Sequence, residues 1–216
     1  MTPESKADHA YRILTDRLAE GVYLPGHRLV IDRLVREHGI SSIPWREALR
    51  RLEAEGWVDI IPNAGAVVRA FTTDDQLSTM RVLGRLEPLA IALSAPHLDA
   101  GEIAAARELE DQAQAALVDF DAAGFAMLDR AFHSLLRAHC PDARLTAMVD
   151  AESLRLAMMD RVLPAHAPGR VAATPKEHAD LLALIESGAC ADEVEEAARA
   201  HRLRTVAAIE AAVTAG

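Results

Sequence analysis

The region from Leu24 to Val58 limits the possible fold of this chain more narrowly than any other. It contains, in order, a Pro-Gly turn, a short amphipathic stretch that Gly39 ends, a longer arginine-bearing amphipathic stretch, and a strand-like run after Gly56. This order is typical of a winged helix-turn-helix, in which the longer helix enters the DNA major groove. We therefore expect this region to bind DNA.

The spacing of apolar residues predicts three helices in the N-terminal third, over 5–20, 30–38 and 42–55. Ser41 is the predicted N-cap of the third, and Pro44 is tolerated in its first turn. Two strand-like runs, 57–61 and 66–70, surround a turn at 62–65 and predict a hairpin. The polar junction that follows divides the chain into a winged helix-turn-helix domain at 1–72 and a second domain at 75–214.

Two faces are predicted for the third helix. Trp45, Ala48, Leu49 and Leu52 share one apolar stripe, whereas Ser42, Arg46 and Arg50 lie on a different face. Arginine can bridge O6 and N7 of guanine, so Arg46 and Arg50 are candidates for reading bases. Other arginines, and Gly65 in the hairpin, are expected to approach the DNA backbone. The predicted DNA-binding residues are Arg28, Ser41, Ser42, Arg46, Arg50, Arg51 and Gly65.

The overall charge of −10 at first argues against nucleic acid. However, residues 1–71 carry 10 basic and 10 acidic side chains, whereas residues 72–216 carry 13 and 23. Residues 28–51 contain six arginines against three acids, so positive charge is concentrated where phosphates would be met. The alternative is that these arginines are only solvated surface charges. The ordered set of turn, helices, glycine and hairpin around them favours DNA binding instead.

The remainder of the chain reads as an antiparallel α-helical bundle. Proline and glycine breaks occur at Pro96, Pro141, the loop from Pro164 to Gly169, and Gly188. Without a hydrophobic leader, a long apolar run or a cysteine framework, the chain is expected to be cytoplasmic. The predicted helices are 74–95, 100–116, 119–139, 143–162, 174–187 and 190–213.

Four residues in the bundle form a candidate metal site. Asp129 and His133 lie four apart on one predicted helix, and His178 and His201 fall on two later ones. A carboxylate with several imidazoles suits zinc, nickel or manganese better than magnesium or calcium. Taken singly, such histidines are more often structural. No functional role is assigned to His97, His139 or His166.

The N-terminal motifs resemble the DNA-binding domain of GntR-family transcription regulators. The resemblance rests on Pro25 to Leu29, Pro44 to Leu49, and Leu52 with Gly56-Trp57-Val58. Two departures concern the target sequence. The family commonly has Arg-Thr where this chain has Ser42-Ile43, and a small aliphatic residue where Trp45 stands. The first departure removes one expected DNA contact.

The C-terminal pattern Asp-x-x-x-His, then Glu-His, then a histidine 23 residues later resembles the FCD-type ligand domain of the FadR-like subgroup. The resemblance implies that Asp129, His133, His178 and His201 hold a divalent metal, with zinc the first choice, and that a small carboxylate effector occupies its open positions. The arginine common four residues before Glu87 is Leu83 here, which leaves Arg81 and Arg85 as candidates for binding the effector.

The preferred hypothesis is a homodimeric, ligand-responsive transcription regulator, expected to be a repressor, that binds operator DNA and is not an enzyme. A metal-dependent hydrolase is the first alternative, since a metal can activate water. Glu177 is its nominal general base. A bundle that holds a metal only for structural reasons is the second alternative.

Overall fold

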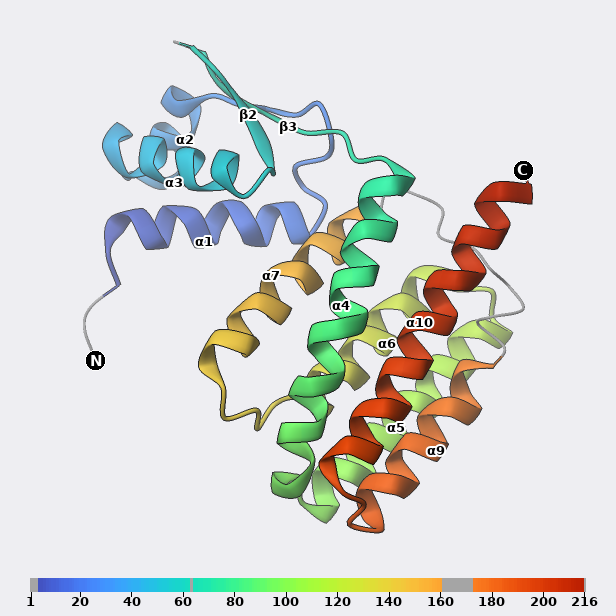
Figure 1. The fold of residues 1–216 in the computed structure, drawn as a ribbon. Helices are drawn as coiled ribbons and strands as arrows, with labels where there is room; N and C mark the ends of the chain where they lie inside the picture. The colour runs from blue at the N-terminus through green and yellow to red at the C-terminus, as the bar shows by residue number, and fades with distance from the viewer. Residues whose placement is uncertain (1–3, 63, 161–172, 216) are drawn as a thin grey trace. The chain divides into compact units, whose positions relative to one another are not determined.

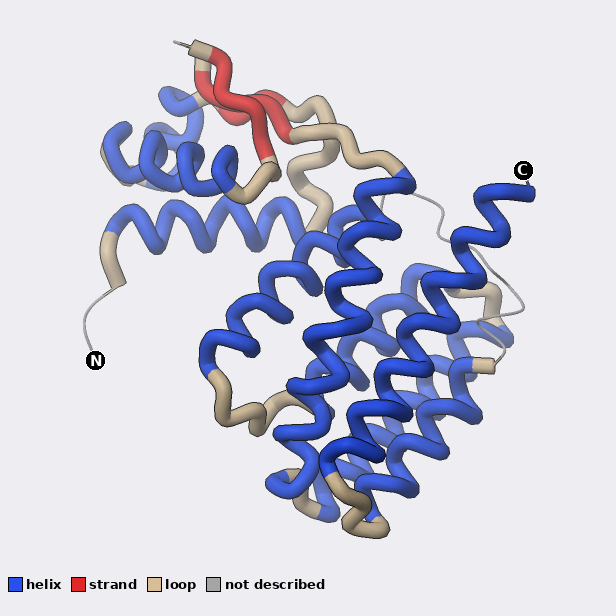
Figure 2. The backbone as a smooth tube through the Cα atoms, viewed as in Figure 1, coloured by secondary structure: helices blue, strands red, loops and turns tan. Residues whose placement is uncertain are grey.

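The computed structural model describes residues 4–62, 64–160 and 173–215 (Figure 1). The chain divides into two compact units, with the boundary between Thr72 and Thr73. Among the described residues, all strands belong to the N-terminal unit, and the C-terminal unit is helical (Figure 2). The predicted fold class, mainly α with an N-terminal winged helix-turn-helix followed by a helical bundle, is confirmed.

Three helices form the helical part of the N-terminal unit: α1 (Lys6–Ala19), α2 (Ile31–His38) and α3 (Ser42–Ala54). Helix α1 begins after Ser5, whose hydroxyl accepts a hydrogen bond from the Asp8 backbone N–H at 3.0 Å. Helix α2 ends at Gly39, whose φ of 67° lies in the left-handed region that glycine adopts without steric cost. These local signals position α2 and α3 as consecutive helices with a tight connection.

The apolar stripe of α3 packs inward as predicted. Trp45 and Leu52 are fully buried, and the Trp45 indole N–H donates to the backbone oxygen of Ile40 at 3.2 Å. Ser41 occupies the N-cap position, but its side chain makes no capping hydrogen bond. The prediction that the Ser41 hydroxyl caps α3 is therefore wrong, and burial of the inner face carries the stability of this helix.

A three-stranded antiparallel sheet completes the N-terminal unit, with strand order β1-β3-β2. The predicted hairpin is present as β2 (Val58–Ile61) and β3 (Gly65–Val68), and residue 63 in its turn lies outside the described residues. The third strand, β1 (Arg28–Leu29), was not predicted, because two residues are too few to show an alternating pattern. It pairs with β3 through the register Arg28 with Val67.

The C-terminal unit begins with α4 (Thr73–Ser94), which continues into a short 3₁₀ turn, η1 (Ala95–His97). The predicted helix over 119–139 is shorter than expected, because Phe120 has a φ of 59° and the Asp121 side chain caps a new helix start. The predicted loop from Pro164 to Gly169, with His166, lies outside the described residues. The other helices are α5 (Ala100–Val118), α6 (Ala122–Leu136), α7 (Ala143–Met159), α9 (Thr174–Glu186) and α10 (Ala191–Ala215).

Helices α4 and α10 run side by side in opposite directions (Figure 1). Two apolar clusters hold the bundle together. One joins α4, α5, α6, α9 and α10, and the other joins α4, α7 and α10. Along α10, His201 and Arg202 fall between Ala198 of the first cluster and Val206 of the second. Polar side chains therefore enter the interior between two hydrophobic regions. Of the helices described, none is long and apolar enough to cross a membrane.

Candidate metal centre and DNA-binding surface

The helical bundle brings Asp129, His133, His178 and His201 together from three helices. Asp129 and His133 lie one turn apart on α6, His178 lies on α9 and His201 on α10. One potential ligand atom from each residue lies within 4.8 Å of the others. The three imidazoles are almost completely buried, and Asp129 is partly exposed. The packing of the apolar faces of α6, α9 and α10 thus places these four polar side chains at one point.

The Nε2 atoms of the imidazoles share one side of the cluster. His178 Nε2 lies 3.3 Å from His201 Nε2 and 3.7 Å from Asp129 Oδ1. His133 Nε2 lies 4.0 Å from the same carboxylate oxygen. This donor set of three nitrogens and one carboxylate is one that first-row divalent metals accept.

A glutamate lies behind each imidazole, next to the opposite ring nitrogen, Nδ1. Glu110 contacts Nδ1 of His178 directly, and Glu177 lies 2.8 Å from Nδ1 of His201. Glu87 lies 3.5 Å from Nδ1 of His133. At His178 and His201 the carboxylate holds the proton on Nδ1 and leaves Nε2 with a free lone pair, which is the common arrangement behind metal-binding histidines.

His133 supplies the test of whether a metal fits. Both of its ring nitrogens are buried and make no hydrogen bond to any described residue. Burial, followed by the positive charges of Arg202 and the neighbouring histidines, sets the pKa of His133 well below its usual value, so the ring is neutral. A buried, neutral and unsatisfied imidazole costs about 1–3 kcal/mol, and a cation among these side chains would remove that cost.

Arg202 is the buried cation next to this cluster, and it was not predicted from the sequence. Its guanidinium donates to Glu87 at 2.6 Å and lies 3.7 Å from Oδ2 of Asp129. Burial alone would lower the pKa of Arg202, but attraction to Glu87 and Asp129 outweighs this and raises it. Phe132 stacks on the His178 ring, with centroids 4.0 Å apart. These contacts fix the orientation of the ligand side chains from behind.

The positions of Glu87 and Glu110 in the sequence could have indicated that both side chains are buried beside a partner. Glu110 lies on the buried face of α5 between Ala106 and Ala113, so an acid interrupts an otherwise apolar stripe. The same is true of Glu87, which follows buried Leu83 by four residues on α4. A charged residue at a stripe position needs a partner, and here the partners are a histidine for Glu110 and Arg202 for Glu87.

Among the described contacts of this cluster there is none to Arg81 or Arg85, so their role in binding an effector stays a prediction. Both side chains are exposed, and Arg81 pairs with Glu210 on α10 at 2.5 Å. The inward positions on this part of α4 are taken by Leu83 and Glu87.

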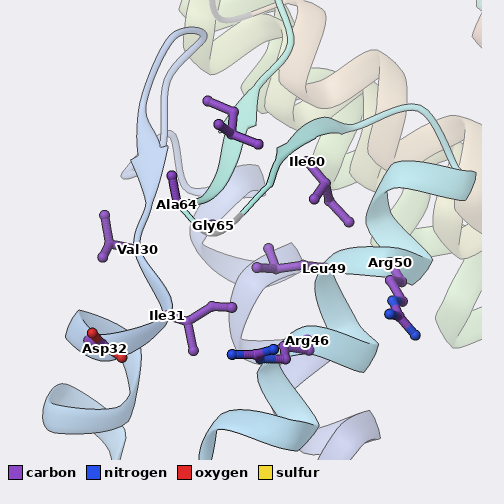
Figure 3. A pocket seen from close by; sticks show the side chains of 10 residues that line it. Val30, Ile31, Asp32, Arg46, Leu49, Arg50, Ile60, Ala64 and Gly65 are labelled. Carbon is purple, nitrogen blue, oxygen red and sulfur yellow. The ribbon is translucent and has the colours of Figure 1, made fainter.

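On the N-terminal unit, a hollow of about 400 Å³ lies between α2, α3 and the β2–β3 hairpin (Figure 3). Arg46 and Arg50 are exposed and line it from α3. Ile31 and Asp32 lie across the hollow from Arg46 (Figure 3). Neither of these arginines forms an ion pair with a described residue, so both guanidinium groups are available to an external acceptor.

The other predicted DNA-binding residues differ in their surroundings. Arg28 and Ser41 are exposed, and Ser42 is half-buried at the start of α3. Arg51, by contrast, turns toward α1, where its guanidinium lies 3.6 Å from the centre of the Tyr11 ring and pairs with Glu55. The structure thus separates Arg51 from Arg46 and Arg50, because its partners lie within the domain.

Gly65 has a structural constraint that the sequence did not predict. Its φ is 104°, and a Cβ atom built there would lie 2.1 Å from the backbone oxygen of Leu29. A glycine is therefore needed here because β1 approaches β3 closely, and the predicted approach of Gly65 to DNA stays a prediction.

Comparison with known proteins gives two family matches. Residues 6–68 match the profile of bacterial regulatory proteins of the gntR family, and residues 78–205 match the FCD domain. An uncharacterised HTH-type transcriptional regulator encoded in the TAR-I ttuE-ttuC' intergenic region of Agrobacterium vitis is 30% identical over 132 residues, or 60% of this chain and 77% of that protein.

Solved structures agree with this similarity. A transcriptional regulator described as a GntR family member, from Pseudomonas syringae, is 28% identical and covers 99% of this chain and 91% of its own, with a TM-score of 0.55. The structure of Escherichia coli McbR covers 94% of both chains with a TM-score of 0.69 at 22% identity, which shows a common fold. By sequence alone, the alignment with McbR spans 47% of that protein.

Proposed function

Because the chain belongs to the GntR family of bacterial regulatory proteins, carries an FCD domain and is a transcription regulator rather than an enzyme, we propose that it is a metal-dependent, acid-responsive repressor. The observation that carries the proposal is the convergence of Asp129, His133, His178 and His201, with a glutamate behind each imidazole. The metal-dependent hydrolase considered from the sequence is set aside by the family assignment.

The N-terminal unit binds operator DNA through α3. Its exposed arginines, Arg46 and Arg50, have no ion-pair partner among the described residues, whereas the opposite face of the helix is buried in the domain. The first turns of such a helix contact base edges in the major groove. Arg28 and the exposed start of α3 at Ser41 are assigned to the phosphate backbone, which fixes register.

The C-terminal unit holds a divalent metal, with zinc as the first choice and nickel or manganese as the alternatives. Asp129, His133, His178 and His201 are the ligands, and the metal offers open coordination positions to a small carboxylate. Glu110 and Glu177 orient two of the imidazoles, and Arg202 holds Glu87 while placing positive charge near Asp129. That positive charge would also attract an acid that enters the site.

A homodimer is the form in which this chain acts on DNA, since one recognition helix covers only a few base pairs and two-fold pairing doubles the site. The acid changes DNA affinity only if it binds more tightly to one arrangement of the dimer than to the other. The candidate ligand side chains come from α6, α9 and α10, so an acid bound to the metal would bias how these helices pack and, through them, the separation of the two recognition helices.

The test is a fluorescence anisotropy titration of the full-length protein with duplexes selected from a random DNA pool. We expect binding that weakens steeply with salt, and a shift in Kd when small organic acids are added to the metal-loaded protein. His178→Ala should abolish the acid response. His139→Ala is the matched control, because the His139 side chain is exposed and its partner among the described residues is Glu102.

Two results would contradict the proposal in different ways. Absence of salt-sensitive binding to any selected duplex would overturn DNA regulation itself. Binding that no acid in a broad panel changes, together with a melting temperature that falls when metal is chelated, would support a metal with a purely structural role.

A further inference from the structure

The outward face of α3 carries an exposed aliphatic side chain beside its two arginines. Ile43 is 67% exposed, more than any other large aliphatic residue described in the N-terminal unit. It precedes Arg46 by three positions and Arg50 by seven, so the three side chains share one face of the helix. No described residue buries Ile43, whereas the inner face of α3 is fully packed.

The charge around Ile43 favours the bases of DNA over its backbone as the contacting surface. Arg46 and Arg50 attract DNA, but Glu47, one turn after Ile43 and also exposed, is repelled by phosphate. A glutamate can accept a hydrogen bond from cytosine N4, and arginine can donate to guanine, so both polar residue types on this face match base edges. The apolar group that a base presents in the major groove is the 5-methyl group of thymine.

This inference rests on the proposed binding of operator DNA by α3. We propose that Ile43 is a specificity-determining residue that contacts the methyl group of a thymine in each half-site. The helix rises 1.5 Å per residue, so Ile43 and Arg46 lie about 4.5 Å apart along the axis, close to the roughly 3.4 Å between stacked base pairs. The thymine therefore lies within about two base pairs of the base that Arg46 reads.

Deoxyuridine provides the test, because it differs from thymidine only by the missing methyl group. A duplex selected by the wild-type full-length protein is made with each thymine of the half-site replaced in turn by deoxyuridine, and Kd is measured by fluorescence anisotropy. One replacement should weaken wild-type binding about fourfold, the factor expected for losing contact with one methyl-sized group. Ile43→Ala should bind the thymine and deoxyuridine duplexes equally well.

Leu24→Ala is the matched control, since Leu24 is also an exposed aliphatic residue of this unit, at 51%, but lies outside α3. This variant should keep the fourfold preference for thymine. A selected half-site without thymine, or a thymine preference that is the same in wild type and Ile43→Ala, would overturn the role of Ile43 while leaving DNA regulation intact. Loss of all DNA binding by the wild type would overturn both proposals.

Discussion

At the scale of single residues, the buried histidines depend on the carboxylates behind them. Glu110 is 6% exposed and contacts Nδ1 of His178, so it fixes both the tautomer and the angle of that ring. The other two imidazoles have their own glutamates, Glu177 for His201 and Glu87 for His133. Binding of a metal should therefore be sensitive to residues that do not touch it.

Glu110→Gln should weaken metal binding by roughly 10- to 100-fold, because the amide still fills the space but no longer draws the Nδ1 proton as a carboxylate does. Competition against a chromophoric chelator measures this affinity. Glu108→Gln is the control, since Glu108 lies on the exposed side of the same helix. Equal affinities for the two variants would mean that Glu110 does not support the metal ligand.

Gly65→Ala should destabilise the N-terminal unit by roughly 1–3 kcal/mol, because it combines an unfavourable φ with a clash against the Leu29 carbonyl. The free energy of unfolding is measured by urea denaturation of the full chain, followed by tryptophan fluorescence, since both Trp45 and Trp57 lie in this unit. Gly26→Ala is the control: φ is 84° at Gly26, but a Cβ atom built there would meet no neighbouring atom within 4 Å. This variant therefore measures the destabilisation that comes from the unfavourable φ alone. If Gly65→Ala lowers the free energy of unfolding no more than Gly26→Ala does, β1 does not constrain position 65.

At the scale of elements, the arginines of α3 lie on different faces of the helix and have different surroundings. Arg46 and Arg50 line the hollow beside the hairpin, whereas Arg51 stacks on Tyr11 of α1 and pairs with Glu55. Three arginines within six residues of one helix therefore have two different roles: two face outward and one ties α3 to α1.

Arg46→Ala should weaken operator binding by roughly 1–3 kcal/mol and relax the preference for one base pair, if this side chain reads a base. Arg51→Ala should lower the stability of the domain but change operator affinity much less. Anisotropy titrations with the selected duplex and with single-base variants measure both effects. Uniform weakening on all duplexes, with a salt slope reduced by about one, would reassign Arg46 to a phosphate.

The elements also show what the sequence could and could not predict. The helices and the hairpin followed from apolar spacing and from breaks at glycine and proline, since these signals are local. Strand β1 was missed because its two residues gain their conformation only from pairing with β3. The close contact between Gly65 and Leu29 was missed for the same reason, and the contact of Arg51 with Tyr11 on α1 is equally non-local.

At the scale of the whole molecule, the resemblance to the FCD-type ligand domain identified four residues that the fold brings together, but it did not identify the residues packed behind them. The spacing of Asp129 and His133 is visible on one helix. That Glu110 lies behind His178, and Arg202 beside Glu87, depends on how α5, α9, α10 and α4 pack. Acids on otherwise buried helix faces, such as Glu87 on α4 and Glu110 on α5, were the sequence feature that could have identified these residues.

Native mass spectrometry of the full-length protein, reconstituted with zinc, nickel or manganese, tests the metal centre most directly. We expect one divalent ion per chain in the wild type and in the exposed-histidine control His139→Ala, and none in His133→Ala or His178→Ala under the same conditions. Circular dichroism of each variant is the control that checks whether its helices are retained. A wild-type protein that binds no divalent ion, or an ion retained at full occupancy in both buried-histidine variants, would contradict the assignment of these residues as metal ligands.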